Sequence, residues 1–94
     1  MEVFKRRPFK VGEREFVTMA AFDKNVRAAH VWVETTAGDP VVATFSDGSK
    51  ATYDYRVTLE MQQDITALTG INAIEQLMKT AEATVRENVE QGWS

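Results

Sequence analysis

The sequence predicts an α+β fold: an antiparallel meander of four or five strands, followed by a C-terminal helical hairpin packed on one face of the sheet. Three observations lead to this prediction. Between residues 14 and 57, runs rich in Val, Thr, Phe, Tyr and Trp have the composition and alternation of strands. From residue 58 onward the apolar period lengthens to that of amphipathic helices. Gly, Asp, Asn and Pro separate these segments, as turns require.

Two helices are expected at the C-terminal end. The longer one spans residues 72–91, with Asn72 as its N-terminal cap and Gly92 as its stop. Its apolar stripe consists of Ile71, Ile74, Leu77, Met78, Ala81, Val85 and Val89. The shorter helix runs from a Thr58 cap to about Leu68 and ends at Thr69-Gly70. Its apolar side carries Met61, Ile65 and Leu68.

Residues 14–22 and 26–36 are predicted to be two strands joined by a three-residue loop, residues 23–25. A helix over residues 23–33 is the alternative, but the β-branched and aromatic side chains of 31–36 favour a strand. The expected register sets Phe22 opposite Val26 and Phe16 opposite Trp32. One face then carries Phe16, Ala20, Phe22, Val26, Ala28 and Trp32, and the other carries Val17, Met19, Ala21, Ala29, Val31 and Val33.

Residues 41–45 and 49–57 are predicted to form a hairpin. A three-residue loop of Ser46, Asp47 and Gly48 sets Ala43 against Ala51, whereas a two-residue turn would set apolar side chains against polar ones. The three-residue loop also requires Gly48 in the left-handed region. At the other end of the sheet, residues 9–11 are expected to be a short edge strand, because Pro8 lacks a ladder donor.

The composition is that of one soluble globular domain, residues 1–94, with 44% hydrophobic and 27% charged residues. There is no cysteine, no apolar run of membrane-span length and no apolar signal region, so we expect a cytoplasmic protein. Residues 1–30 hold seven Lys and Arg against four Asp and Glu, whereas residues 31–94 hold four against ten. Residues 1–8 are alternatively a flexible basic N-terminal arm.

No residue pattern indicates a catalytic centre, a cofactor or a metal site. His30 is the only histidine, and no second ligand-type residue lies near it in the sequence. The basic cluster of Lys5, Arg6, Arg7 and Lys10 is the candidate for binding nucleic acid or an acidic partner. The net charge of −3 makes nucleic acid the less favoured of these ligands.

The leading functional hypothesis is a non-catalytic protein-binding domain that associates with a second copy of itself. Two helices can cover one face of a small sheet, but both faces of the strands at 14–22 and 26–36 carry apolar side chains. The candidate interface residues are Val17, Met19, Val31, Val33 and Trp93. A nucleic-acid-associated regulator is the alternative, and a small enzyme would require a pocket that gathers His30 with a carboxylate.

Overall fold

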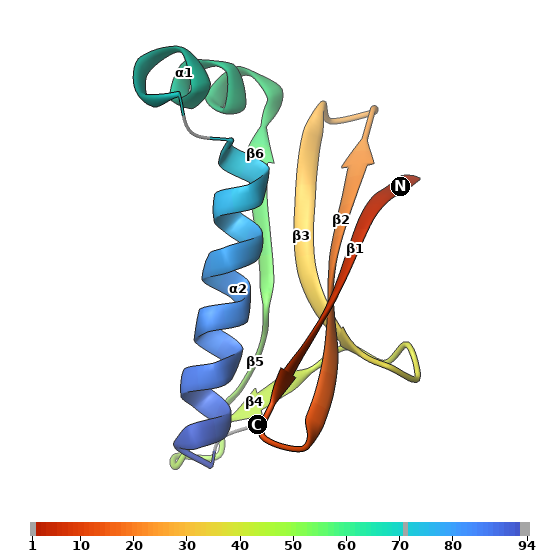
Figure 1. Ribbon diagram of the computed structural model, residues 1–94, viewed down its shortest axis with the longest axis vertical. Coiled ribbons are helices and arrows are strands. Elements are labelled where there is room, and N and C mark those ends of the chain that lie inside the picture. The colour runs from red at the N-terminus through yellow and green to blue at the C-terminus, as the bar shows by residue number, and fades with distance from the viewer. Residues whose placement is uncertain (1, 71, 93–94) are drawn as a thin grey trace.

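Four antiparallel strands form the main sheet in the order β1-β2-β3-β6 (Figure 1). The computed structural model describes residues 2–70 and 72–92. The main sheet consists of β1 (Glu2–Val11), β2 (Arg14–Asp23), β3 (Ala28–Thr35) and β6 (Asp54–Thr58). A separate two-stranded sheet consists of β4 (Val42–Thr44) and β5 (Lys50–Thr52), and the helices are α1 (Leu59–Thr69) and α2 (Ala73–Glu90). The predicted α+β class, an antiparallel sheet followed by two helices, is confirmed.

Helix α2 covers one face of the main sheet and lies along its strands (Figure 1). Met78, Ala81 and Val85 from its predicted stripe are fully buried, and they share one core cluster with Phe16 and Val31. Both predicted helix ends are confirmed. The Asn72 side chain accepts a hydrogen bond from the Glu75 N–H (3.1 Å), and Gly92, with φ 81°, donates its N–H to the Val89 carbonyl (3.0 Å).

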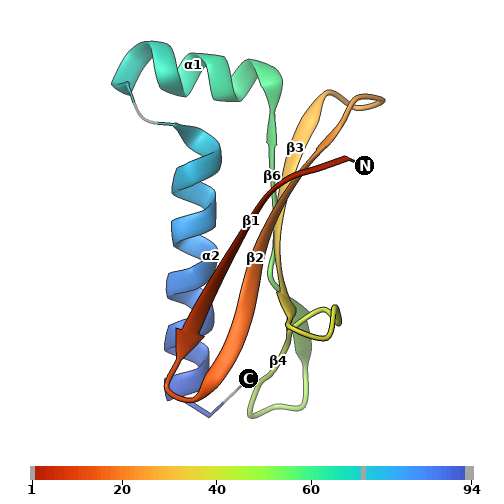
Figure 2. The same cartoon turned by 45° about the vertical axis from the view of Figure 1, so that its right-hand side comes forward.

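Helix α1 lies crosswise to α2 at one end of the sheet (Figures 1 and 2). Thr58 caps it as predicted, accepting the Met61 N–H at 3.2 Å. None of its residues is buried, and Leu68 is 85% exposed. Helix α2 therefore covers the face of the sheet, whereas α1 packs only at one end of the sheet, through Ile65.

The predicted register between β2 and β3 is wrong. Asp23 pairs with Ala28 and Phe16 pairs with Thr35, so the loop contains the four residues 24–27 rather than the three residues 23–25, and Arg27 has positive φ (51°). This odd shift exchanges the faces of β3 relative to β2. Val31 and Val33 now share the α2-covered face with Phe16 and Ala20. In this register the compact β-branched side chains of Val31 and Val33 fill the core beneath α2. The indole N–H of Trp32 stays on the opposite face, where it can form a hydrogen bond.

Strand β1 is longer than predicted. Residues 2–8, expected as a possible flexible arm, form most of this strand, which pairs with β2 from Glu2 to Val11 apart from a bulge between Val3 and Lys5. The sheet order confirms that the Pro8 strand lies at an edge. Pairing with β2 and contacts to α2 supply the hydrogen bonds and ion pairs that hold this segment.

The hairpin register at Ser46–Gly48 is confirmed, with Ala43 paired to Ala51. The predicted strand 49–57, however, divides at Tyr53: β5 pairs with β4, whereas β6 pairs with β3. Tyr53 is buried, and its hydroxyl oxygen accepts a hydrogen bond from the Asn88 side-chain amide (2.7 Å). This contact to α2 fixes the point at which the chain leaves one sheet and joins the other.

Gly48 provides a test of the hairpin. Its φ is +87°, and a Cβ added there would meet no atom within 4 Å, so the cost of a side chain is one of backbone conformation alone. We expect Gly48→Val to destabilise the protein by about 1–2 kcal/mol, because a β-branched residue is disfavoured in the left-handed region. Urea unfolding measures this, with Gly48→Asn as the control that tolerates the same φ. Equal midpoints for the Val variant and the wild type would contradict the assigned loop.

Candidate functional site

The candidate functional site is the face of the main sheet that points away from α2, which we call the open face. Side chains alternate along a strand, and directly paired residues share a face, so the register assigns its members. They are Val3, Arg6, Pro8 and Lys10 on β1, Glu15, Val17, Met19, Ala21 and Asp23 on β2, Ala28, His30, Trp32 and Glu34 on β3, and Asp54, Arg56 and Thr58 on β6. Neither described helix packs across this face, and the loop of residues 36–40 projects from the same side (Figures 1 and 2).

One row of directly paired residues crosses the open face from edge to edge. Arg6 pairs with Met19, Met19 with Trp32, and Trp32 with Asp54; we call these four the central row. Met19 is 6% exposed and Trp32 is half-buried, whereas Arg6 and Asp54 are exposed. The Trp32 indole N–H donates to the Glu34 carboxylate (2.7 Å), which fixes the ring on the surface. The row therefore has an apolar centre between a cation and an anion.

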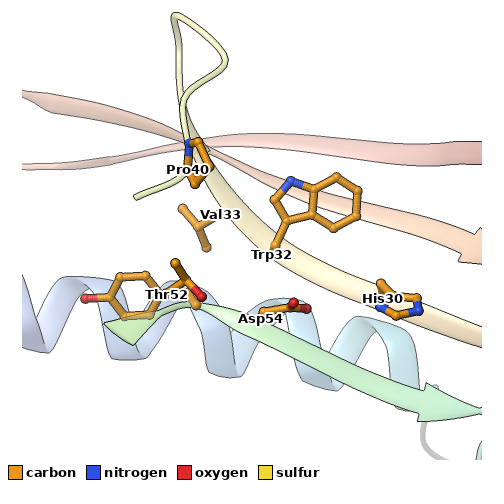
Figure 3. Close-up of a pocket in the computed structure, with 7 residues that line it drawn as sticks. His30, Trp32, Val33, Pro40, Thr52 and Asp54 are labelled. Atoms are coloured by element: carbon orange, nitrogen blue, oxygen red, sulfur yellow. The ribbon is translucent and has the colours of Figure 1, made fainter. Parts of the chain in front are cut away.

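Two hollows lie on the open face, one on each side of Trp32. The first, of about 270 Å³, is lined by His30, Trp32, Val33, Pro40, Thr52, Tyr53 and Asp54 (Figure 3). The second, of about 260 Å³, is lined by Arg6, Val17, Met19, Glu34 and residues 35–38 at the end of β3 and in the loop that follows. Trp32 lines the first hollow, and its paired residue Met19 and its hydrogen-bond partner Glu34 line the second.

The first hollow gathers His30 with the Asp54 carboxylate, which is the arrangement that the sequence required of an enzyme. Within the described residues, however, no hydrogen bond joins the two side chains, and the Nε2 atom of His30 is buried without a partner. A general base needs a nitrogen that reaches the substrate and a partner that orients the ring. No group of three or more His, Asp or Glu side chains in the described chain could hold a metal ion.

The basic cluster is divided between the two faces of β1. Lys5 and Arg7 point toward α2, where both form ion pairs with Glu75. Arg7 also donates from Nε to Glu82 (2.7 Å), and Thr18 donates to the same carboxylate (2.9 Å). Lys10 pairs with Glu15 at 3.3 Å, and Arg6 lies on the open face. Strand alternation has therefore separated four cations that are near neighbours in the sequence.

These ion pairs change the acid–base behaviour of the helix. Hydrogen bonds from Lys5 and Arg7 lower the pKa of Glu75 from 4.5 to about 2. The hydrogen bond to Glu82 raises the pKa of Arg7 above its ordinary value. The charges of Lys5 and Arg7 are consequently neutralised within the molecule, and they fasten β1 to α2.

The predicted interface residues on β2 and β3 lie on opposite faces of the sheet. Val17 and Met19 lie on the open face, but Val31 and Val33 are 0% and 1% exposed beneath α2, so the prediction that all four share one face is wrong. Trp93 lies outside the described residues. The sequence reasoning missed Trp32 and Asp54 as members of this surface. Both could have been found only with the correct β2–β3 register, since an odd shift decides which side of β3 faces solvent.

Comparisons with family models, curated proteins and solved structures find no match to this chain. Neither of the two described helices is both long and apolar enough to cross a membrane. The fold and the open face describe a small α+β domain in which α2 covers one face of the sheet and the other face points outward.

The Glu75 ion pairs predict a specific dependence of stability on pH. A carboxylate whose pKa is lower in the folded state stabilises that state above the unfolded pKa and loses the contribution as pH falls through the folded value. For Glu75 this window runs from 4.5 down to about 2. We expect Glu75→Gln to be less stable than the wild type near pH 6, and the difference to shrink as the pH falls to about 2.

Urea unfolding at a series of pH values measures this difference. Glu87→Gln is the matched control, because Glu87 is an exposed α2 carboxylate that forms no ion pair within the described residues. A stability difference for Glu75→Gln that is the same at pH 6 and near pH 2 would show that the ion pairs to β1 do not stabilise the fold.

Proposed function

We propose that this chain is a small non-catalytic protein-binding domain that contacts its partner through the open face. The central row carries this proposal. Trp, Met and Arg are the side chains enriched in protein interfaces, and energetically dominant residues cluster near the centre of an interface, inside a rim of polar contacts that exclude water. Met19 and Trp32 supply such a centre, and Arg6, Glu34 and Asp54 surround it with charge.

Binding is favoured over catalysis because the features of the open face serve recognition rather than bond chemistry. His30 shares its hollow with Asp54, but its buried Nε2 is not positioned to take a proton from a substrate in that hollow. Trp32, in contrast, presents a large half-buried ring beside the same hollow. The cytoplasmic location that the cysteine-free composition suggests is part of this proposal.

A nucleic-acid-binding function has less support, because Lys5, Arg7 and Lys10 are occupied by carboxylates of the same chain. We expect duplex DNA binding to be undetectable at micromolar protein in about 150 mM salt, since few phosphates could be neutralised. An electrophoretic titration at low and moderate salt measures this. Sub-micromolar affinity that is lost in an Arg6→Ala variant would favour the nucleic-acid function instead.

Retention of partner proteins tests the proposed function directly. The tagged protein and the untagged chain are expressed together in the native cell, cross-linked, and purified through the tag. We expect the retained proteins to be lost with Trp32→Gln and with Asp54→Arg, because both changes alter the central row. The matched control is Lys79→Glu, a charge reversal on an exposed position of α2. Equal retention by all variants, or none by the wild type, would contradict the proposal.

A further inference from the structure

The central row is complementary to itself. Reading across the sheet, its order is cation, Met, Trp and anion: Arg6 at the β1 edge, Met19 on β2, Trp32 on β3 and Asp54 at the β6 edge. A two-fold axis parallel to the strands, placed between β2 and β3, would reverse this order in a facing copy. Arg6 of one copy would then meet Asp54 of the other, twice, and Trp32 would meet Met19, twice.

The relief of the open face fits the same operation. Trp32 presents a half-buried ring, and the hollow on the β1 side of it is lined by Arg6, Val17 and Met19, among others. The axis that sets Trp32 over Met19 of the facing copy also sets the ring over this hollow. Shape and charge therefore select the same orientation, although they are independent properties of the surface.

The edges of the sheet do not offer an equivalent contact. Strand β1 is the long edge, but Pro8 lacks an N–H, the strand bulges between Val3 and Lys5, and charged side chains line it. These are the devices by which natural proteins prevent strand addition at an edge. The other edge, β6, is only five residues long. A second copy is thus accommodated face to face rather than edge to edge.

The size of the open face is adequate for a stable contact. Four strands lie about 4.8 Å apart; β1, β2 and β3 are eight to ten residues long at about 3.3 Å per residue, and β6 has five residues, so the face measures roughly 20 by 30 Å at its widest. This area is comparable with the roughly 800 Å² that each partner contributes to a standard protein interface. Two sheets packed face to face, about 10 Å apart, would bury most of the central row.

We propose that the occupant of the open face is a second copy of this chain, bound about a two-fold axis that runs parallel to the strands between β2 and β3. This inference rests on the proposed function, since it names the partner of the same surface. Arg6 and Asp54 of opposite copies form the two flanking ion pairs, and Met19 and Trp32 form the centre.

Mixing two single variants tests the pairing. Arg6→Glu places like charges at both flanking contacts of its own homodimer, and Asp54→Arg does the same with the opposite sign. Each variant alone should therefore self-associate about a hundredfold more weakly than the wild type. An equimolar mixture restores both ion pairs, so we expect a heterodimer in sedimentation equilibrium, with about twice the 10.6 kDa mass of the chain. Residues 6 and 54 lie about 14 Å apart within one copy, so the ion pair between these two positions can form only between copies.

Three results would overturn the inference: a monomeric wild type at tens of micromolar, variants that remain dimeric, or a mixture of monomeric variants that stays monomeric. Lys79→Glu should leave the dimer unchanged, and circular dichroism verifies that each variant is folded. If either variant unfolds, the cysteine-free chain permits Arg6→Cys and Asp54→Cys instead. A short bis-maleimide should then link the two variants to each other but neither to itself. A monomeric wild type that still retains another protein through Trp32 would refute only the second copy, and leave the proposed function standing.

Discussion

The packing of one helix against one face of the sheet is the constraint on which the rest of the structure depends. Met78, Ala81 and Val85 of α2 meet Val31 and Val33 of β3 in the dry core. A single stripe of this width covers only one face of four strands. Side chains alternate along each strand, so the neighbours of the core residues consequently point outward. On β2 and β3 these outward side chains include Met19 and Trp32. The open face is thus a direct product of the α2 contact.

The ion pairs between β1 and α2 have a related consequence. Glu75 and Glu82 draw Lys5 and Arg7 to the helix side, so that β1 is bound to α2 as well as to β2. Because side chains alternate, the same arrangement turns Arg6 to the open face. A sequence of adjacent cations that resembles a nucleic-acid-binding arm therefore performs two separate tasks. Two of its members stabilise the fold, and one supplies the positive end of the central row.

The local elements could be predicted from the sequence because local chemistry determines them. Asn72 and Thr58 cap their helices, and the parity of Ala43 and Ala51 selected the correct hairpin loop. The β2–β3 register could not be derived in this way, because the loop of residues 24–27 contains no glycine and places Arg27 at positive φ. That single shift decided whether Val31 or Trp32 faced the helix. Of the residues that the sequence assigned to one face, Met19 consequently lies on the open face, whereas Val31 lies in the core.

The central claim, that Met19 and Trp32 of the open face form the contact surface, is tested most directly by an isotope-filtered NOE experiment. A mixture of ¹³C-labelled and unlabelled protein reports only contacts between different molecules, although Met19 and Trp32 are also paired within each chain. We expect intermolecular NOEs between the Met19 methyl group and the Trp32 ring. Intermolecular NOEs confined to α2 or α1, or none from Trp32 at concentrations where the protein is dimeric, would contradict the claim.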